Sequence, residues 1–403
     1  MKALFQTSGL RRQRARSDRR GVALLFALMA MMILTVLVTD MRFAAQVRFL
    51  GASHTRDEAV ALGLANSGIS IYRLILLADR QMSGNTMIRS MLMGRTLSDI
   101  LPIINTGLLR MVFAEGGDVE EEDVEAFNQT GEVSEEVREK SIEASSKFGS
   151  TSFLDIPGEF SASISGEDCK LNLNTLSTHT NGQSIQELPV AQLLYRMMST
   201  EENMDWLRDR NLDPWDLIAN IVDWVDADDA VSSGKGGYED EFYSRLSSPY
   251  LAKNAPFDTK EELRLVEGWQ DEVYARFADQ LSIYGSSKIN INCADSKMVQ
   301  AMIQSGSTRI ISDSEMSRIM DELNNYRMAT YFQKASDACT WFKSEVPDMD
   351  TTSFCKTIST STKVFSIEST GIVGDTAVTI HTVISYDSVT GSKEGKFLYW
   401  RIQ

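Results

Sequence analysis

Residues 22–38 read VALLFALMAMMILTVLV and directly follow Arg19-Arg20-Gly21. No charged side chain occurs in the 18 residues from Val22 through Thr39. At about 1.5 Å of rise per residue, a helix of this length is just long enough to cross the hydrocarbon core of a bilayer. Because the arginines precede the apolar run, the N-terminal end is predicted to be cytoplasmic and the C-terminal body to lie across the membrane.

A cleaved secretory signal is the alternative for this segment. Such a signal has an apolar stretch of about 7–15 residues and ends in small residues at its cleavage site. The residues after Val38 are Thr39, Asp40, Met41 and Arg42, which contain no Ala-x-Ala-like site. The pattern therefore favours a membrane helix that is not removed at this point.

The net charge is unevenly distributed along the chain. Residues 1–21 hold seven basic side chains and one acid, a charge of +6; the whole chain of 403 residues carries −16, which leaves −22 for the remainder. Proteins that bind nucleic acid carry a basic face, so this balance disfavours nucleic acid as a partner. A hydrophobic content of 43% and a charged content of 24% are typical of a globular protein. The length suggests about two to three domains.

The apolar run continues into an amphipathic segment. Spacings built from three and four residues connect the apolar side chains Phe43, Val47, Leu50, Leu62, Ala65, Ile69, Tyr72 and Leu76. This periodicity predicts one long helix over residues 22–78. Its start is expected to be the membrane anchor, and its end is expected to pack on a globular body.

A short basic leader that ends in Gly, followed by an apolar and then an amphipathic helix, resembles the class III signal of type IV pilins and type II secretion pseudopilins. The resemblance implies that a prepilin peptidase cuts after Gly21, on the cytoplasmic side of the apolar run. It implies methylation of the new N-terminal residue, Val22. It also implies that the apolar helix first anchors the protein in the inner membrane and later packs in the core of a helical filament.

One departure from the pilin pattern points to a particular type of pseudopilin. Most pilins carry Glu at the fifth mature position, where it neutralises the terminal amine of a neighbouring subunit. Counted from Val22, this position is Phe26. A buried carboxylate without a partner is unfavourable, so a subunit with no neighbour above it has no use for one. In this respect the chain resembles the K-type minor pseudopilin, which lacks the Glu and is placed at the filament tip.

The middle of the chain is also similar to the inserted α-domain of the K-type family. That domain carries an Asp-Trp-Ile-Asp-x-Asp-like segment, a glycine-rich loop, Glu-Asp and an aromatic residue. Here residues 223–228 read DWVDAD, and glycines are followed by Glu239, Asp240 and Tyr243. The resemblance therefore covers the leader and the region from 170 to 294.

Two short segments bracket this region and echo each other, KLNLNT at residues 170–175 and KININC at residues 288–293. Each is interpreted as an apolar strand whose Asn caps the next helix. A similar Asn-x-Asn pattern occurs in helix-hairpin-helix modules, some of which bind DNA. Basic residues are few and scattered between 176 and 287, so two capped helix starts are the preferred interpretation.

These patterns predict an α+β fold: a pilin-like long N-terminal helix packed on an antiparallel sheet, with a large inserted all-α domain. Strand-like patterns occur at 160–165, 170–176, 364–373, 376–386 and 396–402. The predicted divisions are a leader at 1–21, the long helix at 22–78, an acidic insert of unknown role at 79–150, a first part of the sheet at 151–175, the inserted α-helical domain at 176–287, and the second part of the pilin-like domain at 288–403.

Seven carboxylates fall within nineteen residues, and they are Asp223, Asp226, Asp228, Asp229, Glu239, Asp240 and Glu241. They repel one another unless a cation neutralises them, and oxygen ligands around a flexible glycine loop suit calcium. The spacing is not that of an EF-hand, because Val231 and Gly237 stand where such a loop needs Gly and Glu. We expect calcium at Asp226, Asp228, Asp229, Glu239 and Asp240. The resemblance implies the same ion, and a solvated acidic loop is the alternative.

The four cysteines are Cys169, Cys293, Cys339 and Cys355. Outside the cytoplasm an even number suggests disulfides, with three possible connectivities. A bond between Cys339 and Cys355 would close a short loop, and one between Cys169 and Cys293 would tie the start of the inserted domain to its end. Four free thiols are the alternative, and metal binding is disfavoured because no Cys-x-x-Cys occurs.

No enzyme motif is present in the sequence. His54, His179 and His381 stand alone, and neither a His-Glu-x-x-His, a Gly-x-Ser-x-Gly nor a phosphate-binding loop occurs. The resemblance implies a non-enzymatic minor pseudopilin of a type II secretion system, anchored in the inner membrane with its body in the periplasm. Together with other minor pseudopilins it would form the tip complex that initiates and caps the pseudopilus. The alternatives are a type IV pilus minor pilin and a membrane-anchored, helix-hairpin-helix-like binding module.

Overall fold

The computed structural model describes residues 19–114, 134–146, 155, 157–179, 183–232, 238–387 and 395–403. The chain divides into two compact units, Met1–Ala59 and Val60–Gln403. Most of the predicted leader, the acid-rich stretch at 115–133 and the glycine loop at 233–237 lie outside the described residues.

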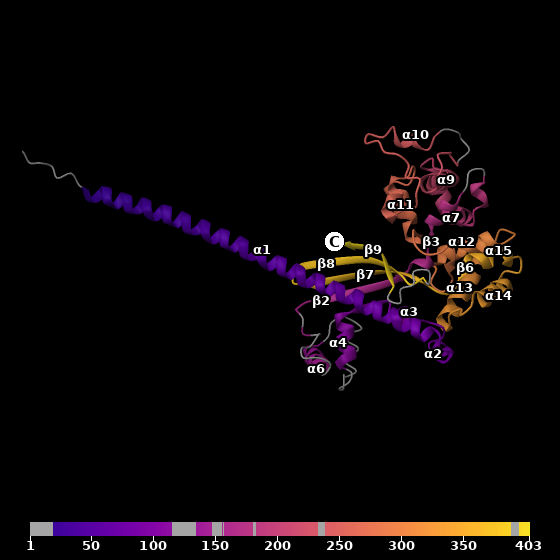
Figure 1. The fold of residues 1–403 in the computed structure, drawn as a ribbon, viewed down its shortest axis with the longest axis horizontal. Helices are drawn as coiled ribbons and strands as arrows, with labels where there is room; N and C mark the ends of the chain where they lie inside the picture. The colour runs from indigo at the N-terminus through magenta and orange to yellow at the C-terminus, as the bar shows by residue number, and fades with distance from the viewer. Residues whose placement is uncertain are drawn as a thin grey trace, which may run out of the picture. The chain divides into compact units, whose positions relative to one another are not determined.

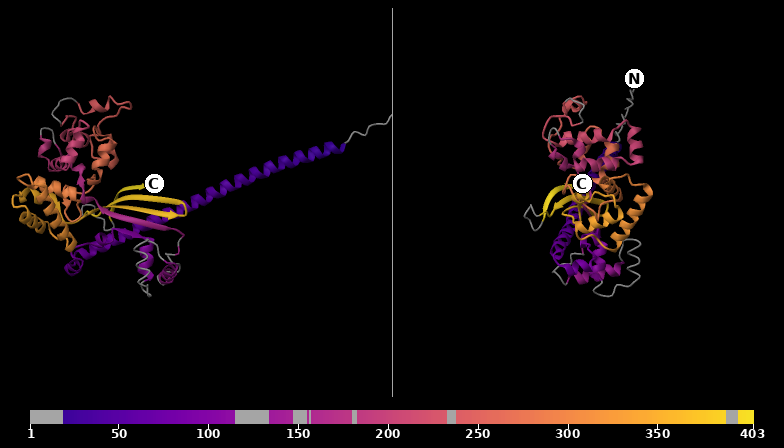
Figure 2. Two further views of the ribbon diagram at one scale, coloured as in Figure 1. Left: turned by 180° about the vertical axis from the view of Figure 1, so that it is seen from behind. Right: turned by 90° about the vertical axis from the view of Figure 1, so that its right-hand side faces the viewer.

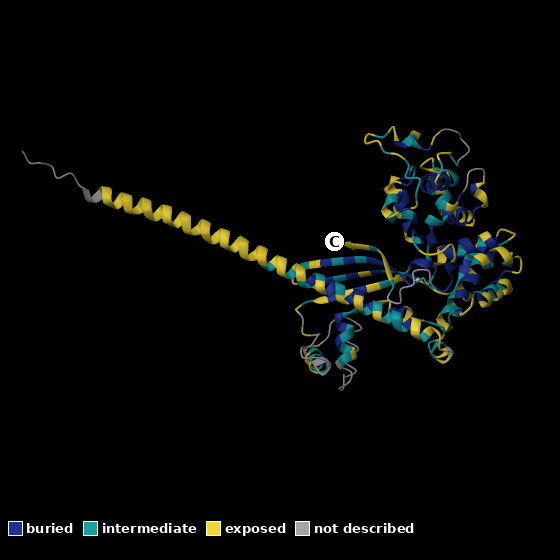
Figure 3. Cartoon of the chain, viewed as in Figure 1, coloured by how far each residue is buried: buried dark blue, intermediate teal, exposed yellow. Residues whose placement is uncertain are grey.

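The described part of the first unit is the beginning of helix α1 (Arg19–Ser83). Every side chain from Val22 through Ala52 is exposed, and Figure 3 colours this stretch accordingly. Among the described residues, this is the one helix that is long and apolar enough to cross a membrane. An apolar helix that buries no face within its own unit requires another apolar environment. The helix therefore fits a single-pass membrane anchor.

The second unit contains the end of α1 and all other described elements, labelled in Figure 1. Its remaining helices are α2 (Thr86–Met91), α3 (Leu97–Ile100), α4 (Thr106–Ala114), α6 (Glu135–Ser146), α7 (Pro189–Met198), α8 (Glu201–Arg208), α9 (Pro214–Val225), α10 (Asp240–Tyr243), α11 (Asp271–Phe277), α12 (Ser296–Gly306), α13 (Asp313–Ala329), α14 (Ala335–Glu345) and α15 (Thr351–Thr357). Its strands are β1 (Ile103–Asn105), β2 (Glu159–Gly166), β3 (Leu171–Asn172), β4 (Leu281–Ser282), β5 (Ile289–Asn290), β6 (Ile358–Ser359), β7 (Val364–Val373), β8 (Thr376–Ser385) and β9 (Lys396–Ile402).

Five of these strands form one antiparallel sheet in the order β1-β2-β7-β8-β9. The strands predicted at 364–373 and 396–402 coincide with β7 and β9. β7 and β8 form a hairpin that turns at Gly374, whose φ of +56° lies in the region that favours glycine.

The end of α1 packs on this sheet along one face. Ala65, Ile69, Tyr72 and Leu76, spaced by three and four residues, are at most 2% exposed. The sheet contributes Phe160, Ala162, Ile367 and Ile380 to the same apolar cluster. A helix stripe with period 3.6 and a strand face with period 2 bury each other in this way. The predicted fold class, a long N-terminal helix on an antiparallel sheet, is confirmed.

Part of the segment predicted as an acidic insert at 79–150 belongs to this sheet and its surroundings. β1 pairs with the middle of β2, residues 161–163, and α4 contacts α6. The helix α3 begins at a capping box formed by Thr96 and Asp99. No sequence pattern predicted β1 and α3, because they span only three and four residues and show no period.

A large helical region separates β2 from β7 in the chain, although these two strands pair in the sheet. Its apolar core runs from Leu171 to Ile358. Helices α12 to α15 therefore share the core of the inserted helices, whereas the predicted division at 287 assigned them to the pilin-like part.

The helical region consists of two modules. The first module begins at β3 and the second begins at β5, and each starts with a short strand that leads into an Asn-x-Asn sequence. The strand predicted at 170–176 is limited to the two residues of β3, after which a 3₁₀ turn spans Leu173–Thr178. β3 pairs in parallel with β4, and β5 pairs in parallel with β6. The modules contact each other through α7 and α12, and Figure 2 shows them from two further sides.

Candidate functional site

The predicted acidic site is built around the end of α9. This helix begins at Asp213, whose side chain accepts hydrogen bonds from the backbone N–H groups of Trp215 and Asp216, and Pro214 occupies its first turn. Asp223 lies in its last turn, and Asp226 is the residue at which it ends. Both carboxylates are buried, because the helix runs through the core of the first module.

Asp226 is 1% exposed, and its Oδ2 lies 2.9 Å from Nδ1 of His179. The other ring nitrogen, Nε2, lies 2.9 Å from the carbonyl oxygen of Gln183. Burial alone would lower the pKa of His179, but these two acceptors raise it above its usual value. Within the described part of the chain, Oδ1 of Asp226 has no hydrogen-bond partner. The buried carboxylate is therefore held by one oxygen and unsatisfied at the other.

Glu239 is 7% exposed, and neither of its carboxylate oxygens has a hydrogen-bond partner among the residues that the structure describes. Burial raises its pKa to about 8, and repulsion from the nearby carboxylates, first those of Asp223 and Asp226, adds to the rise. Burial also raises the pKa of Asp223 to about 6, although Oδ1 of this residue accepts a hydrogen bond from the Ser232 N–H at 2.8 Å. A buried carboxylate without partners is unfavourable unless a cation or proton compensates it.

The other three predicted ligands hold the surrounding loops. Asp228 Oδ1 accepts from the Ala230 N–H at 2.9 Å, and Asp240 Oδ1 accepts from the Ala252 N–H at 2.8 Å. Asp229 Oδ1 accepts from Nδ2 of Asn254 at 3.0 Å. The side-chain oxygen of Asn254 is itself buried without a partner.

Among the described residues, no three His, Cys, Asp or Glu side chains meet as a group able to hold a metal ion. The predicted set divides into two buried carboxylates with at least one unsatisfied oxygen, Asp226 and Glu239, and three that fix loops. Carboxylate and amide oxygens are the donors that calcium takes in proteins, so the chemistry of Asp226, Glu239 and Asn254 fits this ion.

Sequence reasoning missed His179 and Asn254 at this site. His179 is 47 residues from the carboxylate that it contacts, and nothing near it in the sequence marks it. Asn254 had a weak signal, since it lies within the region from 170 to 294 that the K-type resemblance covers.

The Asn-x-Asn pairs have structural roles. Asn172 accepts from the Asn174 N–H at 3.0 Å, and Asn290 accepts from the Asn292 N–H at 3.1 Å. The second Asn of each pair holds a distant backbone with both side-chain groups: Asn174 bonds the N–H and the carbonyl of Phe257, and Asn292 bonds those of Phe332. These amide groups are occupied, which removes the main support for a DNA-binding interpretation.

The four cysteines form two disulfides, Cys169–Cys293 and Cys339–Cys355. The first joins residues that precede and follow the first module, 124 positions apart in the chain. The second joins α14 to α15 within the second module. The first disulfide therefore links the chain just before β3 to the chain just after β5, and the second links two helices of the second module.

The predicted processing residues lie at the start of α1. The helix begins at Arg19, so Gly21 and Val22 are in its first turn. The side chain of Phe26 is 66% exposed, and the apolar side chains next to it are exposed to a similar extent.

Comparison with known proteins identifies the first module. Residues 169–286 match a family described as "Type II secretion system (T2SS), protein K". Over 136 residues the chain is 29% identical to the type II secretion system protein K of Aeromonas hydrophila and 26% identical to that of Pectobacterium carotovorum subsp. carotovorum. These matches cover 33% and 34% of this chain, and the chain spans 39% of the length of each relative. The resemblance to the K-type family is confirmed for this module.

A solved structure is also similar. It is the crystal structure of the GspK-GspI-GspJ complex from the type 2 secretion system of enterotoxigenic Escherichia coli. The similarity has a TM-score of 0.46 at 16% identity and covers 63% of this chain and 85% of that chain.

Proposed function

We propose that this chain, which matches type II secretion system protein K over residues 169–286, is a minor pseudopilin that forms the tip complex of a periplasmic pseudopilus. One observation supports this most strongly: an apolar N-terminal helix continues into an amphipathic part that packs on a five-stranded antiparallel sheet. This is the architecture of a subunit that is first held in a membrane and later built into a filament.

The apolar part of α1 has two roles in this proposal. It anchors the protein in the inner membrane, with the arginine-rich start in the cytoplasm and the body in the periplasm. A prepilin peptidase removes the leader after Gly21, and Val22 becomes the methylated N-terminus. The helix then leaves the lipid and packs beside the helices of other subunits, where van der Waals contacts replace those with lipid.

Two features favour the tip over the shaft of the filament. Phe26 replaces the Glu that would neutralise the amine of a neighbouring subunit. The two helical modules are inserted between β2 and β7, although these strands pair directly with each other. The modules therefore enlarge the subunit without taking part in the sheet. The partners are then two other minor pseudopilins, which add below this subunit, and the role is one of assembly and not of catalysis.

Calcium is part of the proposal. Asp226, Glu239 and the side-chain oxygen of Asn254 would hold the ion, with the other carboxylates of the segment nearby. The support is the set of buried oxygens without hydrogen-bond partners. Bound there, calcium would neutralise the acidic segment and fix the loop that follows α9.

The test is mass spectrometry of the N-terminus of the native protein, combined with a deletion strain. We expect N-methyl-Val22 as the first residue, and we expect secretion to fall on deletion and to recover with the wild-type gene. A Gly21→Val variant should keep its leader and fail to restore secretion, whereas Gly51→Ala, which has nothing within 4 Å of the added methyl group, should restore it. A native protein that begins near residue 40 would contradict the proposal.

A further inference from the structure

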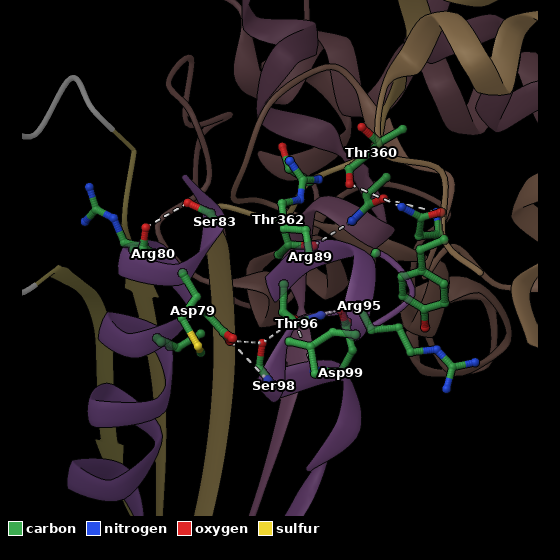
Figure 4. A pocket seen from close by; sticks show the side chains of 18 of the residues that line it. Asp79, Arg80, Ser83, Arg89, Arg95, Thr96, Ser98, Asp99, Thr360 and Thr362 are labelled. Atoms are coloured by element: carbon green, nitrogen blue, oxygen red, sulfur yellow. Dashed lines mark hydrogen bonds between the residues drawn. The ribbon is translucent and has the colours of Figure 1, made fainter. Parts of the chain in front are cut away.

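A cavity of about 270 Å³ lies outside the acidic site and has no role in the proposed function. Most of its lining comes from three parts of the second unit: the last turns of α1, the segment from α2 to α3, and the segment between β6 and the start of β7. Asn290, Asn292, Tyr331 and Tyr386 complete it. Figure 4 shows the side chains that line it, including Arg80, Arg89 and Arg95. The cavity therefore brings together segments far apart in the chain.

The charge of the cavity is opposite to that of the body. Four cationic side chains line it, Arg80, Arg89, Arg95 and Lys363, against the two acids Asp79 and Asp99. The chain as a whole carries −16. A concave basic site on an acidic protein concentrates an anionic ligand and orients it.

Both acids are already engaged in holding α3. Asp79 accepts hydrogen bonds from the Leu97 N–H at 2.6 Å and from the N–H and hydroxyl of Ser98. Asp99 accepts from the N–H and hydroxyl of Thr96. Figure 4 draws the contacts from Asp79 to Ser98. These carboxylates therefore cap a helix through hydrogen bonds to its first residues.

The cations retain capacity for an anion. Arg89 has no ion pair within the part of the chain that the structure describes. Lys363 has an exposed contact of 3.4 Å with Asp387, which is long and screened by solvent. Arg95 donates through Nη2 to the carbonyl oxygens of Arg327 and Met328, while its Nε is buried without a partner.

Intramolecular contacts hold the residues that line the cavity in place without a ligand. Asn290 donates to the hydroxyl of Thr362 at 2.8 Å, and the Tyr331 N–H donates to the carbonyl of Met93 at 2.9 Å. Gly94 adopts a φ of +79°, and a Cβ there would lie 2.9 Å from the Tyr331 carbonyl oxygen. The guanidinium of Arg95 lies over the Tyr331 ring at 5.3 Å from its centre. Preorganised groups lose little entropy when a ligand binds.

The size and lining of the cavity narrow the class of ligand. Its volume is near the lower end of the range of about 300–1,000 Å³ typical of small-molecule sites, so it suits one or two side chains and not a large cofactor. Hydroxyl groups of Thr360, Ser361 and Thr362 and apolar surface from Leu76 and Phe365 adjoin the cations. We propose that this cavity binds a short acidic peptide segment, whose carboxylates meet Arg89 and Lys363 while its backbone meets the hydroxyl groups.

The test uses the full chain in detergent and the peptide acetyl-Glu-Glu-Glu-amide, with binding measured by isothermal titration calorimetry. We expect binding that weakens at least tenfold in Arg89→Gln and in Lys363→Gln, because charge-assisted hydrogen bonds to a carboxylate are lost. Arg208→Gln is the matched control, since this arginine is exposed on α8 and lies outside the cavity. Unchanged circular dichroism of the variants verifies that they fold.

Two further ligands separate a peptide site from a general anion site. Acetyl-Gln-Gln-Gln-amide should not bind measurably, and inorganic phosphate should bind more weakly than the acidic peptide. Phosphate binding as tight as that of the peptide, no binding of the peptide, or equal losses in the control variant would each overturn the proposal. The proposal does not depend on processing at Gly21, so the N-terminal and calorimetric experiments can fail separately.

Discussion

Asp168 holds the backbone of Val364 across the base of the inserted helical region. Its Oδ2 accepts hydrogen bonds from the N–H groups of Lys363 at 2.7 Å and of Val364 at 3.0 Å, and its Oδ1 accepts from the Ser286 N–H at 3.3 Å. Asp168 follows β2, and Val364 begins β7. One buried carboxylate therefore fixes the point where the chain leaves the sheet to the point where it returns.

We expect Asp168→Ala to destabilise the protein by about 3 kcal/mol, because buried N–H groups lose an ionised acceptor. Asp168→Asn keeps one acceptor oxygen and should lose roughly half as much. The measurement is guanidinium chloride unfolding of the full chain in detergent. Asp321→Ala, on the exposed side of α13, should change stability by at most about 0.5 kcal/mol. Equal stability of Asp168→Ala and Asp321→Ala would show that the junction does not depend on this carboxylate.

The close approach of α1 to the sheet gives a second prediction. A Cβ at Gly371 would collide with the backbone carbonyl of Ala61, and one at Gly68 would lie 2.9 Å from Cβ of Ala162. Gly371→Ala and Gly68→Ala should therefore each destabilise the protein by roughly 1–3 kcal/mol. Gly63→Ala, on the same helix with nothing within 4 Å of the new methyl group, should stabilise it by about 0.5–1 kcal/mol.

These three variants distinguish the effect of packing from that of helix propensity. The melting temperature of each, measured by thermal unfolding of the full chain, gives its effect on stability. Since Gly63 and Gly68 occupy the same helix, a methyl group raises the propensity of both positions equally. Opposite signs of the two effects would support the observed contact with the sheet. A stabilising Gly68→Ala would contradict it.

The disulfides give a third prediction. Replacing both Cys339 and Cys355 by Ala should lower the free energy of unfolding by about 3 kcal/mol, because the loop that they close spans 16 residues. Replacing Cys169 and Cys293, whose separation is 124 residues, should lower it by about 4–5 kcal/mol by the same entropy argument. Thiol titration of the unfolded wild-type chain should find no free thiol, and four free thiols would contradict both pairs.

The long elements of the fold were predictable from the sequence because their periods are long enough to detect. The buried positions of α1 repeat every three or four residues from Ala65 to Leu76, and β7 and β8 match the predicted strands closely. The elements that were missed have no such signal. β4 and β6, the partners of the two predicted short strands, have two residues each, and their parallel pairing with β3 and β5 joins segments far apart in the chain.

The acidic site was predictable only in part, for a related reason. The density of carboxylates between Asp223 and Glu241 marks the segment, but not which of them are buried without partners. That depends on the path of α9 through the core and on His179 and Asn254, which approach from other segments. Sequence patterns report local composition, whereas the state of a buried carboxylate depends on the whole surrounding shell.

Calcium should raise the melting temperature of the full chain, and the Glu239→Gln variant should lose most of that rise. An ion that binds only the folded state stabilises it by about 2.7 kcal/mol at a concentration of 100 times its dissociation constant. Glu239 has no hydrogen bond to lose, since both of its oxygens lack partners, so the variant should fold as well as the wild type without calcium. Scanning calorimetry with and without added calcium chloride measures both quantities.

Glu241→Gln is the matched control, because Glu241 lies two positions away, is exposed and pairs with Arg245. It should retain the full response to calcium. Magnesium at the same concentration should give a smaller rise, since it requires near-octahedral geometry and keeps several of its waters, whereas calcium accepts six to eight oxygens in a flexible arrangement. A calcium response that is undiminished in Glu239→Gln would place the ion elsewhere, and the unpaired oxygens of Glu239 would then be satisfied by protonation, in keeping with a pKa of about 8.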